Sequence, residues 1–383
     1  MNLDAKLNEA KQRIAQAPTY DAATADIAAV FESLNDSHAF FVPPGHSIKQ
    51  EYGWRYQMIG NRCLVTRVKP RSDAEAKGVK PGDQVLTLEG FEPTRDSIVR
   101  LQYALDDLMP MRSLTVDLLD PMRKMREVQL KAQLQPAKEI ADMTDMTGEE
   151  QWRMRLEREK EWHLLRVRYK EFGDDLLIVK LPEFVEAQFE IHELISRARK
   201  HKTLVLDLRG SPGGSEETLQ YLLGGLFDKK IKIADRITRT GTKPLETKSD
   251  RHDVFAGNLI VLVDSGSASA SELLARTVQI QKRGTVLGDH TAGATMEAVY
   301  HPHQTGSNPA YYFGASITEA DLVLPDGKSL ERVGVTPDVV FLPSSDDLAH
   351  GRDPAMSHAA ALANVALSPT DAGKLFPYEW PGN

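Results

Sequence analysis

The spacing of apolar residues changes along the chain and predicts different elements in its different parts. In residues 1–35 the apolar positions recur at helical spacing, as at Ile27, Val30 and Phe31, and predict helices. Residues 52–135 carry short apolar runs separated by turns, which predict strands at 64–68, 84–88, 114–119 and 127–130. A short helix is predicted at 72–77, with Ser72 as its N-cap.

The region from residue 174 to residue 345 alternates short apolar runs with helical patterns. Strands are predicted at 176–179, 203–208 and 259–263, and helices at 185–199, 216–227 and 270–281. Such alternation is typical of an α/β layered core. The predicted fold class of the whole chain is therefore α+β, with several domains.

The same patterns divide the chain into successive parts. Residues 136–172 are dense in charge, and Trp152 and Leu156 within this stretch favour an amphipathic helical connector over 149–172 with a solvated face. The predicted parts are an N-terminal helical segment at 1–50, a β-rich domain at 52–135, the connector at 136–172, the α/β core at 173–345 and a helical tail at 346–383.

The composition narrows the functional classes. The chain has 383 residues and a formal net charge of −8, which argues against a nucleic-acid binder, because such proteins neutralise phosphates with many Lys and Arg side chains. No apolar run approaches the ~18 residues needed to span a bilayer. The single cysteine, Cys63, excludes an intrachain disulfide, and its strand-like neighbours predict a buried, inert thiol.

The strongest chemical signal is the run VDSGSASASE at residues 263–272, where a buried strand ends and a helix begins. A serine at this point can be exposed at the edge of the sheet. The free N–H groups and the dipole of the helix N-terminus would stabilise an oxyanion that forms beside it. The alternative is that Ser267, Ser269 and Ser271 only cap the helix.

A second signal, DLRGSPGG at residues 207–214, also follows a buried strand. Paired glycines allow a backbone to approach a ligand closely and to adopt positive φ, which suits an oxyanion donor from Gly213 or Gly214. An ordinary tight strand-to-helix turn would explain the same residues. The run lacks the Lys-Ser/Thr ending of a phosphate-binding P-loop.

Together with ERVGVTPD at residues 331–338, these motifs resemble the C-terminal processing and tricorn-like serine peptidases of family S41. The resemblance extends over residues 21–342. It implies a catalytic core of the ClpP/crotonase-like type with Ser269 as the nucleophile. It also implies an oxyanion hole formed by the amides of Ala270 and of Gly213 or Gly214.

Residues 52–135 resemble the PDZ domain that this family inserts before its core, through the run AEAKGVKPGDQVL at 74–86. PDZ domains bind an extended peptide by adding it to a sheet edge. Residues 53–56 are a weak candidate for the loop that binds a C-terminal carboxylate, and whether such capture occurs is left open.

The chain departs from most C-terminal processing proteases at the general base. Their lysine follows a Thr-x-Gly motif, but here residues 291–294 read TAGA, and Ala294 cannot accept a proton. A serine hydroxyl without a base is a poor nucleophile at neutral pH. The site is therefore either inactive or served by another base.

The tricorn-like branch uses a histidine preceded by a serine, which corresponds here to Ser37-His38, and a glutamate that corresponds to Glu331. The resemblance thus implies a tetrad of Ser269, His38, Ser37 and Glu331, in which His38 moves the proton. His290 is a second candidate base. His301 and His303 have no accompanying cysteine or acidic ligand set, so neither a metal nor another cofactor is predicted.

The leading hypothesis is a serine endopeptidase that acts on unfolded or C-terminally exposed polypeptides, with PDZ-assisted substrate binding and no nucleic-acid partner. The alternatives are a catalytically inactive PDZ scaffold that binds peptides, a crotonase-type enzyme that acts on thioesters, and an esterase or amidase that acts on small molecules. The sequence leaves the oligomeric state open.

The cellular location depends on the N-terminus, whose first residues contain no apolar signal-peptide core. Taken as given, the chain is expected in the cytoplasm. Bacterial relatives are commonly exported and extend further at the N-terminus, so a missing leader would place this chain outside the cytoplasm, in the periplasm or secreted.

Overall fold

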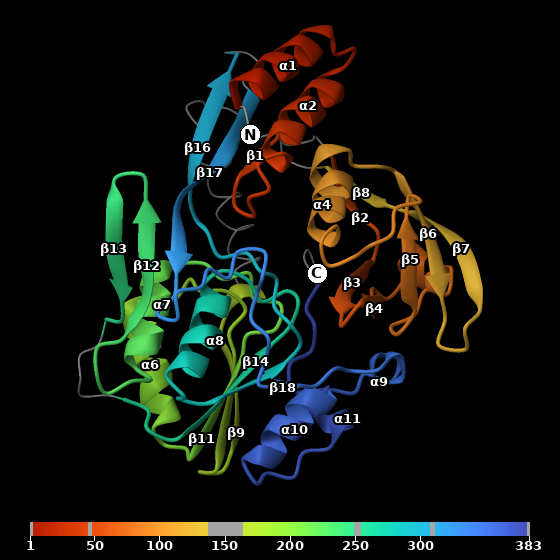
Figure 1. Ribbon diagram of the computed structural model, residues 1–383. Coiled ribbons are helices and arrows are strands. Elements are labelled where there is room, and N and C mark those ends of the chain that lie inside the picture. The colour runs from red at the N-terminus through yellow and green to blue at the C-terminus, as the bar shows by residue number, and fades with distance from the viewer. Residues whose placement is uncertain (1–2, 45–47, 137–163, 249–253, 307–310, 381–383) are drawn as a thin grey trace, which may run out of the picture.

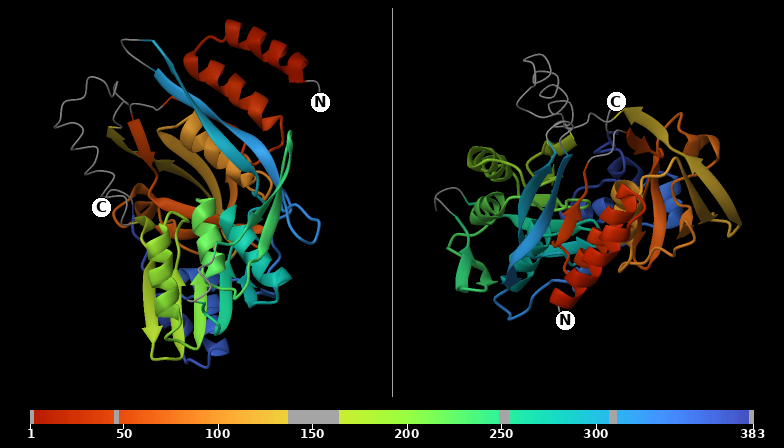
Figure 2. Two further views of the ribbon diagram at one scale, coloured as in Figure 1. Left: turned by 90° about the vertical axis from the view of Figure 1, so that its left-hand side faces the viewer. Right: turned by 90° about the horizontal axis from the view of Figure 1, so that it is seen from above.

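The computed structural model describes residues 3–44, 48–136, 164–248, 254–306 and 311–380. An N-terminal helical hairpin, a β-rich unit and a layered core surround a region of loops (Figure 1). Figure 2 shows the hairpin and the β-rich unit on the same side of the core. No helix within the described residues is long and apolar enough to cross a membrane.

The N-terminal hairpin consists of α1 (Leu3–Gln16) and α2 (Tyr20–Glu32), which confirms the helices predicted for residues 1–35. The Thr19 hydroxyl accepts a hydrogen bond from the amide of Ala22 and caps α2. After α2 the chain enters the short strand β1 (Phe40–Val42). The segment between α2 and β1 contains Ser37 and His38.

The β-rich unit is a five-stranded antiparallel sheet in the order β3-β4-β5-β6-β7. Alternating burial along β6 directs Leu114, Val116 and Leu118 into its core. The strands are β3 (Trp54–Ile59), β4 (Arg62–Val68), β5 (Gln84–Leu88), β6 (Ser113–Leu119) and β7 (Met125–Lys131), which confirms the strands predicted between residues 64 and 130.

Helices and a small second sheet complete the β-rich unit. Ser72 caps α3 (Asp73–Ala76) by accepting a hydrogen bond from the amide of Glu75 at 3.2 Å, as predicted. The unit also contains α4 (Ile98–Tyr103) with a π-helical turn η1 (Ala104–Leu108), and a two-stranded sheet of β2 (Ile48–Glu51) and β8 (Gln133–Pro136). Cys63 is buried, and burial raises the pKa of its thiol to about 12.

The core contains a six-stranded sheet in the order β18-β15-β14-β11-β10-β9. All neighbours pair in parallel except β9 and β10. The strands are β9 (Arg168–Phe172), β10 (Leu176–Lys180), β11 (Thr203–Asp207), β14 (Asn258–Val263), β15 (Thr285–Gly288) and β18 (Val339–Val340).

Helices cover both faces of this sheet (Figure 1). Leu177 and Val179 pack with one set of helices, while Leu176 and Ile178 point to the other face, because side chains alternate along a strand. The first face carries α6 (Gln188–Ala198), α7 (Glu216–Gly224) and α8 (Ala270–Ile280). The opposite face carries α10 (Pro354–Leu362) and α11 (Pro369–Ala372), which follow α9 (Ser345–Ala349).

The predicted helical connector requires a correction at its end. Residues 168–172 form the edge strand β9, which pairs antiparallel with β10 and therefore belongs to the core sheet. The charged residues of β9 are also typical of the solvated face of a helix. An edge strand has charged side chains too, because one of its edges pairs with no other strand and faces solvent. Only the pairing with β10 distinguishes the two. Most of the rest of the predicted connector, residues 137–163, lies outside the described residues.

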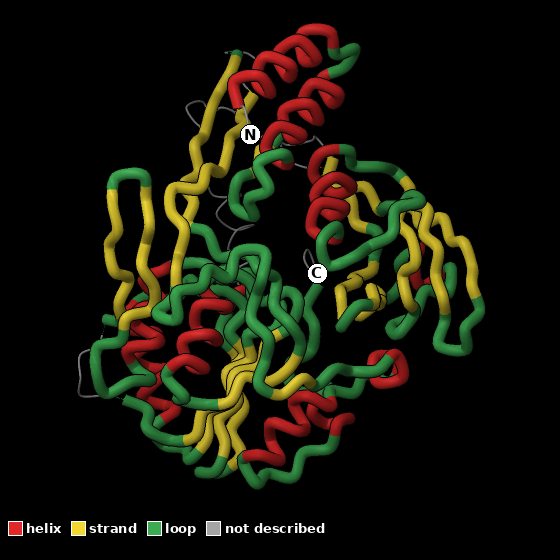
Figure 3. The backbone as a smooth tube through the Cα atoms, in the orientation of Figure 1, coloured by secondary structure: helices red, strands yellow, loops and turns green. Residues whose placement is uncertain are grey.

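A second sheet links the N-terminal segment to the core. Its long strand β17 (Tyr311–Val323) pairs with β1, β12 (Lys232–Thr238) and β16 (Glu297–Thr305), and β12 pairs with β13 (Gly241–Glu246). In the β1–β17 pair, Phe41 lies opposite Ala315. This pairing fixes the segment just before β1, which contains Ser37 and His38, beside the core. In Figure 3 the loops of the core gather at one edge of its sheet, facing this second sheet.

Candidate active site

Ser269 occupies the turn between β14 and α8 in an uncommon backbone conformation, with φ 53° and ψ −117°. A non-glycine residue at positive φ persists only where its surroundings hold it. Here the amide of Ser269 donates to the carbonyl of Ala294 at 2.7 Å and to Oε2 of Glu272 at 3.1 Å. Its hydroxyl makes no capping bond to the helix.

The neighbouring serines are different, and this separates the two readings of the serine run. The hydroxyls of Ser267 and Ser271 are fully buried and donate to the carbonyls of Leu208 at 2.9 Å and Ser211 at 3.1 Å. Both therefore hold the loop after β11 against the loop after β14. Ser269 is half-buried, and its hydroxyl has no such structural bond among the described residues.

Gly213 lies directly against Ser269. With φ +96°, a Cβ at Gly213 would come within 2.7 Å of the Ser269 Cβ and 2.8 Å of the Ala270 amide nitrogen, so glycine is required. Within the described residues, no acceptor is found for the amides of Gly213 and Ala270. Gly214 has a different reason to be glycine, because its Cβ would meet the Phe184 carbonyl oxygen at 2.5 Å.

His38 is backed by a chain of hydrogen bonds to Glu331. The Ser37 hydroxyl donates to Glu331 Oε2 at 2.7 Å and lies 2.8 Å from His38 Nδ1, while the Ser37 amide donates to Glu331 Oε1 at 2.8 Å. Because the only hydroxyl proton of Ser37 points to Glu331, Ser37 must accept from His38, so Nδ1 carries the proton. The lone pair of Nε2 is then free to accept a proton.

The burial of His38 favours its neutral form. Burial lowers the pKa of His38 below its ordinary value, while the charges of Glu331 and Asp36 oppose that shift. Asp36 also holds the segment in place, since its Oδ1 accepts from the amides of His38 at 2.9 Å and Ala39 at 3.1 Å, and from the Thr318 hydroxyl at 2.8 Å. Asp36 was missed in the sequence, although it directly precedes Ser37.

A pocket of about 450 Å³ brings these groups together. Its lining includes His38 from the segment before β1, Ser269 and Ala270 from the start of α8, and Gly213 and Gly214 from the loop after β11. Ser37 and Glu331 lie behind His38 rather than on the pocket wall. The residues predicted for the site therefore come together from four distant parts of the chain.

Glu272 connects the nucleophile turn to residues 291–294. Its fully buried carboxylate accepts from the Thr291 hydroxyl at 2.5 Å, from the amides of Gly293 at 2.8 Å and Ala294 at 2.9 Å, and from the Ser269 amide. Burial raises the pKa of Glu272, and these donors oppose the rise. The serine three residues before Glu272 is the sequence signature of a capping box, which could have indicated this role.

The other candidate residues lie apart from the pocket. His290 is not on its lining, and its Nδ1 lies 3.1 Å from the Thr291 carbonyl oxygen. His301 and His303 lie on β16. In the part of the chain that the structure describes, no group of three or more His, Cys, Asp or Glu side chains could hold a metal ion.

The β-rich unit contacts the loop that carries Ser269. The Gln57 amide on β3 donates to Asp264 Oδ2 at 2.7 Å and to the Ser265 hydroxyl at 3.0 Å. Asp264 Oδ1 in turn accepts from the amides of Gly210 at 2.7 Å and Gly266 at 3.0 Å. Asp264 thus joins β3 to both loops that meet at the candidate oxyanion site.

Comparison with known proteins identifies the family. The model of peptidase family S41 matches residues 175–341, which contain Ser269, Gly213 and Glu331. This core region is that of an S41 peptidase. The match supports a serine-type peptidase, a class of hydrolase.

Curated relatives and solved structures agree with this S41 assignment. The chain is 24% identical to a "Probable CtpA-like serine protease" of Staphylococcus aureus (strain COL) over 293 residues, 76% of this chain and 52% of that one. It is 31% identical to the "Carboxy-terminal-processing protease" of Bartonella bacilliformis over 192 residues, 45% of this chain and 40% of that one. The S41 chain thus spans about half the length of the curated relatives it matches.

Two solved structures share the fold. The crystal structure of mature CPAF matches with a TM-score of 0.67 and 14% identity, covering 91% of this chain and 88% of that one. The photosystem II D1 C-terminal processing protease matches with a TM-score of 0.52 and 19% identity, covering 98% of this chain and 100% of that one. At these identities the likeness shows the fold alone.

Proposed function

We propose that this S41 chain is a serine endopeptidase whose nucleophile is Ser269 and whose general base is His38. The observation that carries the proposal is the single pocket that both residues line, together with the amides of Gly213 and Ala270. Ala294 occupies the position at which most C-terminal processing proteases have their catalytic lysine, so it cannot act as the general base. A histidine with a free Nε2 lone pair, backed by Ser37 and Glu331, can act as the base instead.

The mechanism follows from these groups. His38 Nε2 accepts the Ser269 hydroxyl proton as the oxygen attacks the scissile carbonyl carbon. The amides of Gly213 and Ala270 donate to the oxyanion that forms, and the positive end of α8 stabilises it. His38 then gives its proton to the leaving amine. In the second half, water loses a proton to His38 and attacks the acyl ester on Ser269, and His38 returns that proton to the Ser269 oxygen as the ester bond breaks.

The backing groups hold His38 ready for proton transfer. As His38 becomes charged, the proton on Nδ1 stays directed at the Ser37 hydroxyl, which donates onward to Glu331. The carboxylate therefore stabilises the imidazolium through one intervening hydroxyl. Asp36, which already raises the pKa of His38, adds a second negative charge to the same end. Neither carboxylate needs to accept the proton.

For substrates, we propose unfolded or C-terminally exposed polypeptides, delivered with help from the β-rich unit acting as a PDZ domain. The antiparallel sheet with a flanking helix α4 suits capture of an extended peptide. Its contact through Gln57 to the nucleophile loop places that unit beside the site. The ClpP/crotonase-like type of the core stays a prediction, as does an extracytoplasmic location. The inactive-scaffold alternative has no support in the comparisons.

The test is degradation of casein by the wild-type chain, Ser269→Ala and His38→Ala, with an organophosphonate to label the reactive serine. We expect cleavage by the wild type, loss of at least ~10³-fold in both variants, and the label on Ser269. Circular dichroism of the variants checks that they fold. A folded wild-type chain that neither cleaves casein nor takes the label would overturn the proposal.

A further inference from the structure

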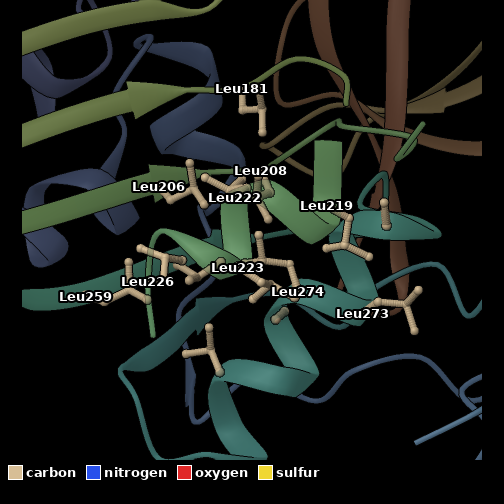
Figure 4. Packing of buried hydrophobic residues seen from close by; sticks show 14 of the residues in the cluster. Leu181, Leu206, Leu208, Leu219, Leu222, Leu223, Leu226, Leu259, Leu273 and Leu274 are labelled. Carbon is tan, nitrogen blue, oxygen red and sulfur yellow. The ribbon is translucent and has the colours of Figure 1, made fainter. Parts of the chain in front are cut away.

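The pocket beside Ser269 has an apolar inner wall. Leu219 on α7, Leu245 on β13, Leu273 on α8 and Leu322 on β17 line it, and each of these leucines is at most 5% exposed. Figure 4 shows Leu219 and Leu273 close together at one edge of the leucine cluster of the core. The pocket is therefore an opening into the edge of the hydrophobic core and favours the apolar part of a substrate side chain.

Carboxylates lie on the same lining, at Glu183, Glu216 and Glu297. Among the residues that the structure describes, no Lys or Arg lies on it. Arg236 on β12, which is not on the lining, forms ion pairs with both Glu216 and Glu297. One guanidinium thus balances one of those two charges. Glu183 has no hydrogen-bond or ion-pair partner within the described residues, so the pocket retains an excess of negative charge.

The position of Glu183 relative to the oxyanion site is fixed by the backbone. The next residue, Phe184, donates its amide to the Gly213 carbonyl at 2.7 Å and accepts from the Ser215 amide at 2.7 Å. A substrate carbonyl that accepts from the Gly213 and Ala270 amides would therefore present its own side chain to the pocket that Glu183 lines. That side chain belongs to the residue on the acyl side of the scissile bond.

The geometry points to selection of a lysine or arginine side chain on the acyl side of the cleaved bond, with Glu183 as the specificity-determining residue. Lysine and arginine have an apolar stem and a cationic end, which match the leucine wall and the unpaired carboxylate. An aspartate or glutamate side chain would place like charges together. This inference rests on the proposed function, because it assigns a preference to the same pocket.

The experiment compares peptide substrates that are identical except on the acyl side, where they carry arginine, citrulline, norleucine or glutamate. Citrulline has the shape of arginine without its charge, so the ratio of kcat/KM for arginine over citrulline isolates the charge. We expect a ratio of roughly fivefold in the wild-type chain, as for a partly solvated ion pair. Added salt should reduce it, because ions screen a half-exposed pair.

Variants assign the preference to Glu183. Glu183→Gln should lower the arginine-to-citrulline ratio below about twofold, since it removes the charge and keeps the shape. The matched control is Glu217→Gln, because Glu217 lies on α7 next to Glu216 but off the pocket, where it pairs with Lys248. That variant should keep the wild-type ratio.

The outcomes separate the two proposals. The inference is overturned if the arginine-to-citrulline ratio of kcat/KM is near one in the wild type, or if Glu183→Gln keeps the wild-type ratio. Ser269-dependent cleavage of any of these peptides would still support the proposed function. If none of the peptides, nor casein, is cleaved in a Ser269-dependent way, the proposed function falls and this inference falls with it.

Discussion

The proposed nucleophile and the proposed base are held in this protein by different kinds of structure. Ser269 is fixed by the core, through bonds from its own amide to Ala294 and Glu272. His38 lies in a segment before a three-residue strand, and it is fixed by long-range bonds to Glu331 and by Asp36. Because His38 lies in a segment before a short strand, whereas Ser269 is fixed by the core, substitutions should displace His38 more easily than they displace Ser269.

The largest effect expected from this comparison is on the base. In Glu331→Gln, the new amide can donate to the Ser37 hydroxyl, which then donates to His38 Nδ1 and moves the imidazole proton to Nε2. The wrong tautomer should lower kcat/KM by about 10³-fold. The measurement is peptide cleavage, with urea unfolding as a control for stability. Activity within tenfold of the wild type would show that His38 does not depend on this chain of bonds.

A somewhat smaller loss is expected on the nucleophile side, from Gly213→Ala. The added methyl would press on the Ser269 Cβ at 2.7 Å and displace an oxyanion donor, so kcat should fall by about 10²- to 10³-fold. The matched control is Gly210→Ala, which carries the same positive-φ strain but has open space around its Cβ. If the two variants lose equal activity, backbone strain and not the close approach to Ser269 is responsible.

The pH dependence of activity reports the protonation state of His38. Only the neutral imidazole accepts a proton, so activity is lost as pH falls through the folded pKa of His38. Because burial lowers that pKa, the acid limb of kcat/KM should lie below the ordinary value of 6.5. Asp36→Asn keeps an acceptor oxygen but removes a charge that raises the pKa, and should shift the limb to lower pH. A shift to higher pH would contradict the proposed role of Asp36.

The smallest effect is expected where the β-rich unit meets the nucleophile loop. Gln57→Ala removes the bonds to Asp264 and Ser265, but Asp264 keeps its bonds to the Gly210 and Gly266 amides. The free energy of unfolding should fall by about 1 kcal/mol, and kcat should change by less than about threefold. A urea titration and casein cleavage measure both. Loss of kcat comparable to Gly213→Ala would show that β3 itself positions the oxyanion loop.

Local order in the sequence was enough to predict the parts of this protein that depend on neighbouring residues. Apolar spacing predicted the strands and helices around Ser269, since period and capping act over neighbouring residues. The Thr-Ala-Gly-Ala run showed that lysine could not be the base at residue 294. The motifs and the family resemblance then named Gly213, Ala270 and the Ser37-His38 pair.

The other features became visible only in the folded chain, because pairing between distant strands has no local signature. Residues 168–172 form an edge strand because they pair with β10. The β1–β17 pairing brings His38 to the pocket. Packing of α8 and of β17 with distant segments creates the hydrogen bonds of Glu272 and Asp36, respectively. Packing of α7, α8, β13 and β17 creates the leucine wall of the pocket that Glu183 also lines. Local sequence thus predicts a serine at the start of a helix, and long-range packing brings it together with the proposed base and the proposed specificity pocket.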